Sequence, residues 1–179
     1  MLPEVLSNDK CSLKPNQDRF CLTVEIILDE KGKKKSHSFF RSLINSKKRL
    51  TYQQVEKIIN KKNTYEIFDK KIIKVINSLH EVYLILEFLR KKRGALNLEL
   101  PERKILFNDT GWPTQIKKVK GLTSNKIIEE LMILANVSAA EEIIKYNYPS
   151  IYRVHEPPSE EKYKTLIDII GKPLANILI

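Results

Sequence analysis

The clearest pattern in the chain is a series of apolar residues separated by alternating steps of four and three positions. The residues that follow these steps are Phe68, Ile72, Val75, Leu79, Val82, Leu86 and Leu89. Such steps place side chains on one face of an α-helix, so the pattern predicts a helix over 68–89 with this face buried. The cations of LRKKRG and the glycine that follows them predict its C-terminal end at Gly94. The spacing is also heptad-like, but the repeat is short, which favours packing against a sheet over a coiled coil.

Alternating and β-branched residues predict several strands. These strands are residues 20–28, 36–46, 95–100, 103–109, 114–121 and 151–155. The first two flank the charged turn DEKGKKK and predict an antiparallel hairpin with a basic tip. The segments on either side of Thr110-Gly111-Trp112-Pro113 predict a second hairpin.

Three further helices are indicated by their start signals or their composition. Thr51 and Gln54 have the spacing of a capping box, which predicts a helix from Tyr52 to about Asn60. The segment 125–147 is apolar around much of its circumference, so we expect a buried helix there. Ser159, followed by two glutamates, predicts the start of a helix near the end of the sequence. Helices and strands in this order predict an α+β fold with a mixed antiparallel sheet and packed helices.

Composition and charge narrow the classes of protein that need to be considered. The chain has 179 residues, 42% of them hydrophobic, which suits one globular domain. Lysine and arginine outnumber the acids by 32 to 22, giving a net charge of +10. This excess fits a polyanionic partner such as nucleic acid, and it equally fits a solvated lysine-rich surface. We expect no membrane span and no secretion signal, and hence a cytoplasmic location.

No catalytic motif is evident from the residues alone. Five dispersed glycines argue against a nucleotide-binding loop, and no serine lies in a nucleophile elbow. Cys11 and Cys21 lack metal-ligand spacing, so we expect two buried free thiols and no zinc site. The acids occur as adjacent pairs, which point about 100° apart on a helix and do not form a ready chelate. We therefore expect neither a bound metal nor a small-molecule cofactor on this chain.

Five stretches, taken together, give the chain a resemblance to a known family. They are MLPEVLSNDKCSLKPNQDR, SKKRLTY, RGALNLELPE, KIIEELMILAN and YRVHEPPSEEK. In this order and at this spacing they resemble the RNB catalytic domain of the ribonuclease II / ribonuclease R exoribonucleases, and ribonuclease R most of all. The resemblance implies an RNB-type fold across 1–179. It also implies a parent reaction in which Mg²⁺-dependent hydrolysis of single-stranded RNA from its 3′ end releases nucleoside monophosphates.

The same resemblance implies that the domain is partial. In the family, the aspartate cluster that binds Mg²⁺ precedes LPEVLSN, and the S1-type region follows the stretches matched here. We therefore expect this chain alone to bind no Mg²⁺ and to be inactive as an exoribonuclease. Its expected partners are single-stranded RNA and, for a split enzyme, the complementary fragments. The alternatives are a non-catalytic basic RNA-binding remnant and a non-functional product of a decayed gene.

The resemblance also assigns residues to RNA binding. Tyr52 matches a family tyrosine near the terminal nucleotide, and Glu129 matches a glutamate that contacts the terminal ribose. Leu98 stands where the family has an aromatic residue, so a stacking contribution of roughly 1–3 kcal/mol would be reduced. Independently of the resemblance, two groups of cations are candidates for phosphate contacts: the hairpin tip at Lys31, Lys33, Lys34 and Lys35, and the run Lys47, Lys48 and Arg49. Without the resemblance, Tyr52 is simply the first residue of a capped helix and Glu129 an acid on a polar helix stripe.

Overall fold

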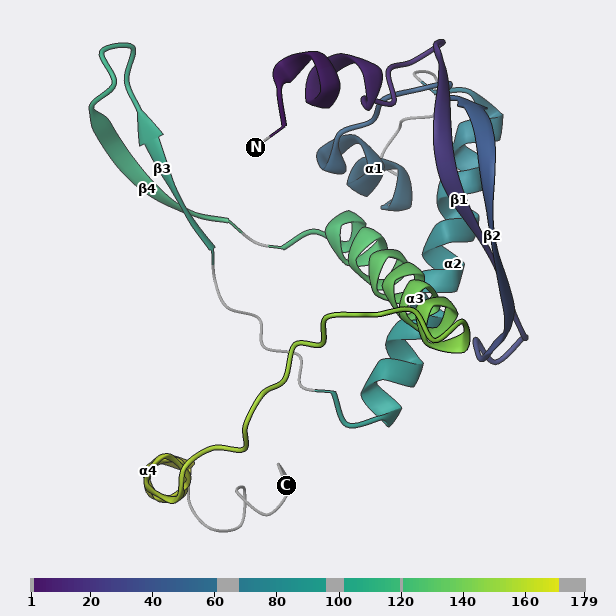
Figure 1. The fold of residues 1–179 in the computed structure, drawn as a ribbon. Helices are drawn as coiled ribbons and strands as arrows, with labels where there is room; N and C mark the ends of the chain where they lie inside the picture. Colours follow the sequence, from purple (N-terminus) through teal and green to yellow (C-terminus); the bar gives the residue numbers. More distant parts are fainter. Residues whose placement is uncertain (1, 61–67, 96–101, 120, 171–179) are drawn as a thin grey trace. The chain divides into compact units, whose positions relative to one another are not determined.

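The computed structural model describes residues 2–60, 68–95, 102–119 and 121–170 (Figure 1). It divides into two units, Met1–Glu142 and Ile143–Ile179, which we treat separately. The elements that begin in the first unit are η1 (Val5–Lys10), β1 (Asp18–Leu28), β2 (Lys34–Asn45), α1 (Tyr52–Ile59), α2 (Lys70–Lys92), β3 (Glu102–Phe107), β4 (Pro113–Val119) and α3 (Thr123–Lys145). The predicted α+β class is confirmed, and the described strands form two separate two-stranded antiparallel sheets.

Both predicted hairpins are present. In the first, β1 and β2 pair from Asp18 opposite Asn45 to Leu28 opposite Lys34, with an irregularity in register next to the turn. The Asp29 carboxylate accepts hydrogen bonds from the amides of Lys31 and Lys33, which closes this turn. The second hairpin joins β3 and β4. The strand predicted at 95–100 lies outside the described residues.

The long central helix forms where the pattern predicts it, and its buried side chains overlap the predicted face only in part. The buried residues of α2 are Ile73, Ile76, Tyr83 and Leu86, whereas Val75 is 58% exposed. The predicted face is therefore right only in part: Phe68 and Leu86 are buried and Val75 is not, because runs such as Ile72-Ile73 and Val75-Ile76 offer two neighbouring apolar stripes. The helix ends as predicted, with Gly94 at positive φ. The Gly94 and Ala95 amides donate to Lys91 and Arg90, which is a Schellman motif.

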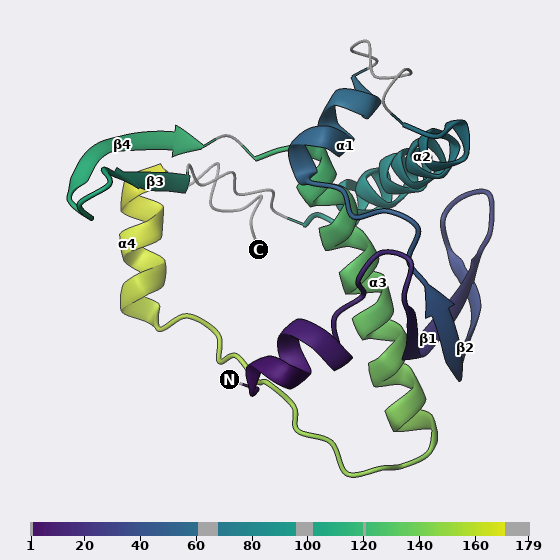
Figure 2. The same cartoon turned by 90° about the horizontal axis from the view of Figure 1, so that it is seen from above.

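The third helix is less buried than its composition indicates. Figures 1 and 2 show α3 beside α2 and the β1–β2 hairpin. The buried residues of α3 are Ser124, Ile127, Glu130 and Ser138, of which Ser124 bonds to α1, Glu130 to α2 and Ser138 to β2. Several large apolar side chains on its remaining surface are more than a third exposed: Ile128, Met132, Ile133, Val137, Ile143 and Ile144. The expectation of a fully buried helix is therefore corrected, because the described elements cover only one side of it.

Two further expectations are corrected elsewhere. In the second unit, α4 (Glu160–Ile170) begins as predicted, with the Ser159 hydroxyl accepting from the Lys162 amide. The segment 151–155 is not a strand, because no described strand pairs with it and both Ile151 and Val154 are solvent-exposed. Both cysteines are free thiols as expected, but Cys11 is exposed and only Cys21 is partly covered.

The turn of the β1–β2 hairpin packs tightly against α2 at Gly32. This glycine has φ +79°, and a Cβ placed on it would lie 2.5 Å from Ile85 Cγ2 and 3.1 Å from Leu89 Cδ1. Gly111 has a similar φ of +83°, but a Cβ there would meet no atom within 4 Å. The two positions therefore share the backbone constraint and differ in crowding.

We expect Gly32→Ala to lower the free energy of unfolding by about 2–4 kcal/mol, from left-handed backbone strain and overpacking together. Gly111→Ala is the matched control and should cost about 1 kcal/mol, from strain alone. Urea unfolding monitored by circular dichroism measures both values. Equal losses for the two variants would show that the hairpin turn does not pack on α2 in solution.

Candidate nucleic-acid interface

The segment that links β2 to α1 presents three cations and a tyrosine. Lys47, Lys48 and Arg49 are all exposed. The Gln54 amide donates to Thr51 Oγ1 at 3.3 Å, and the Thr51 amide donates to Gln54 Oε1 at 2.8 Å. This capping box confirms the predicted helix start and fixes the backbone at Tyr52, a residue that is 46% exposed.

An open groove of about 590 Å³ lies beside this segment. Lys47, Lys48 and Tyr52 line it together with side chains from α2 and α3. Val75 and Ile128 belong to its apolar lining, and both are well exposed. The groove therefore combines ammonium groups, one phenol ring and an apolar floor, a combination that can hold a phosphate backbone and a stacked base.

Ser124 connects the beginning of α3 to the beginning of α1. Its hydroxyl donates to the carbonyl oxygen of Tyr52 at 2.9 Å, and its amide donates to Glu56 Oε2 at 3.0 Å. The serine is only 2% exposed, so both bonds are shielded from water. These two bonds consequently fix the position of the first turn of α3 relative to the backbone of Tyr52.

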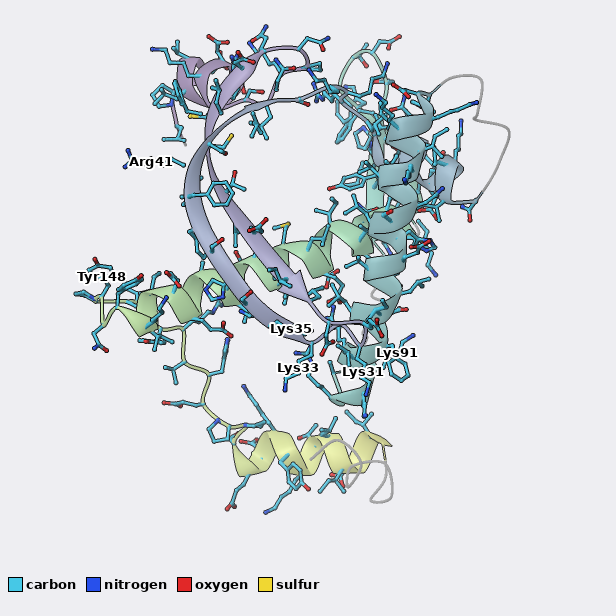
Figure 3. All side chains as sticks on the ribbon, turned by 90° about the vertical axis from the view of Figure 1, so that its right-hand side faces the viewer. Lys31, Lys33, Lys35, Arg41, Lys91 and Tyr148 are labelled. Atoms are coloured by element: carbon cyan, nitrogen blue, oxygen red, sulfur yellow. The ribbon has the colours of Figure 1, made fainter. Side chains whose placement is uncertain are left out.

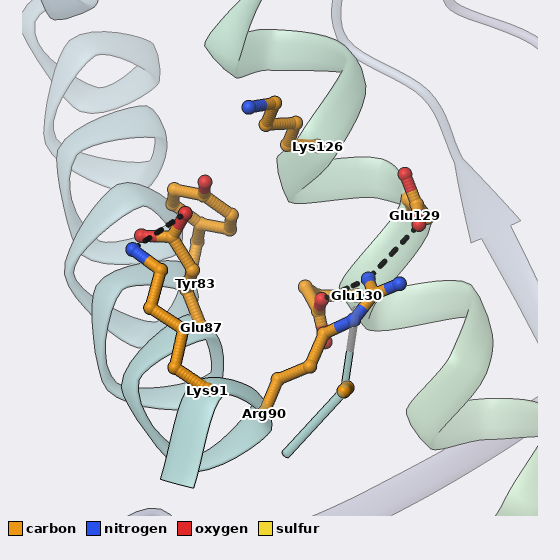
Figure 4. A pocket seen from close by; sticks show the side chains of 8 residues that line it. Tyr83, Glu87, Arg90, Lys91, Lys126, Glu129 and Glu130 are labelled. Carbon is orange, nitrogen blue, oxygen red and sulfur yellow. Dashed lines mark hydrogen bonds and ion pairs between the residues drawn. The ribbon is translucent and has the colours of Figure 1, made fainter. Parts of the chain in front are cut away.

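A second, smaller pocket of about 40 Å³ lies between α2 and α3 (Figure 4). Arg90 Nη1 reaches across it and donates to Glu130 Oε1 at 2.7 Å and to Glu129 Oε1 at 3.0 Å. The hydrogen bond to Glu130 and, to a lesser extent, the one to Glu129 raise the pKa of Arg90 above its usual value. In the same pocket, the pKa of Tyr83 is raised above its usual value, mainly by burial and to a lesser extent by a hydrogen bond to Glu87. The tyrosine is therefore neutral and the guanidinium charged at physiological pH.

The hairpin tip forms a separate basic surface. Figure 3 shows Lys31, Lys33 and Lys35 there, with Lys91 of α2 nearby. Lys34 does not belong to this surface, although the sequence suggests that it should. Its ammonium group donates to Ser138 Oγ at 3.1 Å and forms an ion pair with Glu141, so it holds β2 to α3.

The residues predicted to bind RNA lie at two places. Lys47, Lys48 and Tyr52 line the groove, whereas Glu129 lines the smaller pocket with Arg90. Arg49 is exposed in the linking segment but does not line the groove, and Leu98 lies outside the described residues. Sequence reasoning missed the contributions of Ser124 and Arg90. The only available signals were a small polar residue at a helix start and an arginine in a cationic helix end.

The donor groups do not suit a magnesium site. Among residues 2–60, 68–95, 102–119 and 121–170, no three His, Cys, Asp or Glu side chains converge. Mg²⁺ requires oxygen ligands gathered in near-octahedral geometry, so the described residues do not fit the ion that the resemblance implies. Within the same ranges, no helix is long and apolar enough to cross a membrane.

A family comparison places these features in context. The RNB domain model matches residues 1–177, and the chain therefore belongs to the RNB domain family. This confirms the resemblance that the five sequence stretches carry.

Three relatives illustrate the similarity. Ribonuclease R of Vibrio cholerae is 38% identical over 172 residues, which are 96% of this chain and 21% of the relative. Ribonuclease R of Aquifex aeolicus is 37% identical over 170 residues, covering 95% of this chain and 24% of the relative. The structure of Mycoplasma genitalium RNase R in complex with ribose methylated single-stranded RNA matches with a TM-score of 0.88 and 32% identity, over 95% of this chain and 26% of that one. The chain thus spans about a fifth to a quarter of these relatives.

We expect the linking segment to give RNA binding part of its salt dependence. Replacing Lys47, Lys48 and Arg49 together by Gln should make the negative slope of log K against log salt shallower by about 2, because fewer counterions are released from a single strand. Fluorescence anisotropy with single-stranded RNA from 50 to 300 mM salt measures this slope. The control replaces three exposed cations of the second hairpin, Lys104, Lys117 and Lys118, by Gln. An equal change in both triple variants would mean that the binding is diffuse and not centred on the groove.

Proposed function

We propose that this chain is the RNA-contacting part of an RNB-type 3′-to-5′ exoribonuclease that hydrolyses RNA to nucleoside monophosphates. The observation that carries the proposal is the groove, where Lys47, Lys48 and Tyr52 lie together in a chain of the RNB domain family. The solved relative from Mycoplasma genitalium is complexed with single-stranded RNA, which supports the same ligand class here. Hydrolysis itself is proposed for the whole enzyme and not for these residues.

In this proposal the groove forms part of the wall of an RNA channel. The ammonium groups of Lys47 and Lys48 neutralise phosphates, and the ring of Tyr52 offers a face for a base or a phenol for a ribose. Glu129 recognises the terminal ribose, since a carboxylate accepts a hydrogen bond from a 2′-hydroxyl, which DNA lacks. Leu98 is proposed to contact the terminal base without stacking on it. Partnership with complementary fragments of a split enzyme and a cytoplasmic location stay predictions.

The second candidate function is RNA binding without catalysis. The poor fit of the described side chains to Mg²⁺ favours it for the chain in isolation. The two candidates agree on the RNA surface and differ in whether a further part of an enzyme is needed for hydrolysis. They can therefore be separated by measuring binding and cleavage in one experiment.

We expect the purified chain with Mg²⁺ to bind single-stranded RNA more tightly than DNA of the same sequence, and to release no nucleoside monophosphates. The physical reasons are the 2′-hydroxyl contact and the lack of convergent carboxylates among the described residues. Gel-shift titration and thin-layer chromatography of a labelled RNA measure the two properties.

The outcomes distinguish the alternatives. Monophosphate release above that of a mock-purified control would show that the chain is a complete nuclease. Equal affinity for RNA and DNA would reject ribose recognition and leave only a basic surface. Failure to bind either polymer would reject the proposed function.

A further inference from the structure

The contact between Arg90 and two adjacent glutamates suggests a role that neither the family match nor the sequence assigns. Glu130 is largely buried, with 7% of its side chain exposed, whereas 54% of the Glu129 side chain is exposed. Both accept a hydrogen bond from the same nitrogen, Nη1 of Arg90. One acid is thus inside the protein and its neighbour faces solvent, with a single guanidinium joining them.

The two glutamates affect Arg90 differently. A buried carboxylate requires a charged partner, so Glu130 fixes the guanidinium in place at 2.7 Å. The fixed guanidinium then holds the neighbouring Glu129 at 3.0 Å, although that side chain would otherwise move freely in water. Figure 4 shows Arg90 extending from α2 toward both acids on α3. Because the planar guanidinium is rigid, it sets the direction of the Glu129 carboxylate.

We propose that Arg90 is a positioning residue that orients the Glu129 carboxylate for the 2′-hydroxyl of a 3′-terminal ribose. The inference rests on the proposed function, from which the role of Glu129 is taken. Arg90 binds Oε1 of Glu129, and a carboxylate has a second oxygen, Oε2, that can accept from the ribose. Arg90 itself does not contact the RNA in this proposal; it acts through Glu129.

The test compares two RNA oligonucleotides that differ only in a 2′-deoxy group on the 3′-terminal nucleotide. We expect the wild-type chain to bind the all-ribose form more tightly, and Glu129→Gln to bring the affinity ratio close to one. Arg90→Gln should reduce the ratio by a similar factor, on the order of tenfold where the wild-type ratio is that large. The affinity for the deoxy-terminated form should stay the same. A loss of general folding would lower both affinities, so only a positioning role changes the ratio alone.

Three further variants sharpen the comparison. Arg90→Lys keeps the charge beside Glu130 but lacks the rigid, coplanar N–H groups of Nη1, so it should remain folded by circular dichroism and still lose part of the ratio. The double variant Arg90→Gln/Glu129→Gln should lose no more than either single variant, because both act on one contact. Lys91→Gln is the control, since Lys91 lines the same pocket but pairs with Glu87. It should leave the ratio unchanged.

Each result decides the matter. If Glu129→Gln lowers the ratio and both Arg90 variants keep it, the positioning role is wrong while the proposed function stands. If the Arg90 variants lower both affinities equally, Arg90 is only structural and the proposal is overturned. If the wild-type chain does not distinguish the two oligonucleotides, ribose recognition fails and the inference fails with it.

Discussion

Buried polar contacts of the first half of α3 with α1 and α2 are the constraint on which the candidate RNA surface depends. Ser124, Ile127 and Glu130 recur at three-residue steps and are all buried. Two of these three residues are polar. Their burial is favourable only when each side chain has a hydrogen-bond partner. Ser124 bonds to the Tyr52 carbonyl and to Glu56, and Glu130 bonds to Arg90. The residues proposed to read RNA are neighbours of these buried contacts.

The second half of α3 is held by a different set of polar contacts. Ser138 is fully buried and accepts from Lys34, whose ammonium group also pairs with Glu141. His37 on the same strand lies 3.2 Å from a Glu142 carboxylate oxygen. One helix therefore joins the hairpin at one end and two helices at the other. The lysines of the hairpin tip therefore differ in environment. Lys34 bonds to α3, whereas Lys31, Lys33 and Lys35 face solvent.

Local signals in the sequence predict the elements well, and tertiary contacts explain the failures. The capping box at Thr51 and the glycine that ends α2 depend on neighbouring residues, so both could be predicted. The buried face of α2 could not be predicted, because its apolar residues form two stripes and tertiary packing selects between them: Ile73 and Ile76 are buried in one cluster with Ile58 of α1. The short apolar segment 151–155 is not a strand, and no strand among the described residues pairs with it.

The candidate site follows the same division. Lys47, Lys48 and Tyr52 are close in sequence and belong to one motif. Their position at a common groove could therefore be expected from the sequence. The pairing of Arg90 with Glu129 joins residues 39 positions apart on two helices, and no local pattern indicates it. Adjacent glutamates on a helix diverge, yet a guanidinium from a second helix reaches both. Only the packing of the helices reveals that contact.

The central claim is that the linking segment and the start of α3 together form the RNA-contacting surface. Photo-cross-linking of the chain to a single-stranded RNA with a photoreactive 3′-terminal nucleotide, followed by mass spectrometry of the cross-linked peptides, tests it most directly. The account predicts cross-links within residues 47–52 and 123–130, and their loss when unlabelled RNA competes. Cross-links confined to the β3–β4 hairpin or to the second unit would contradict it.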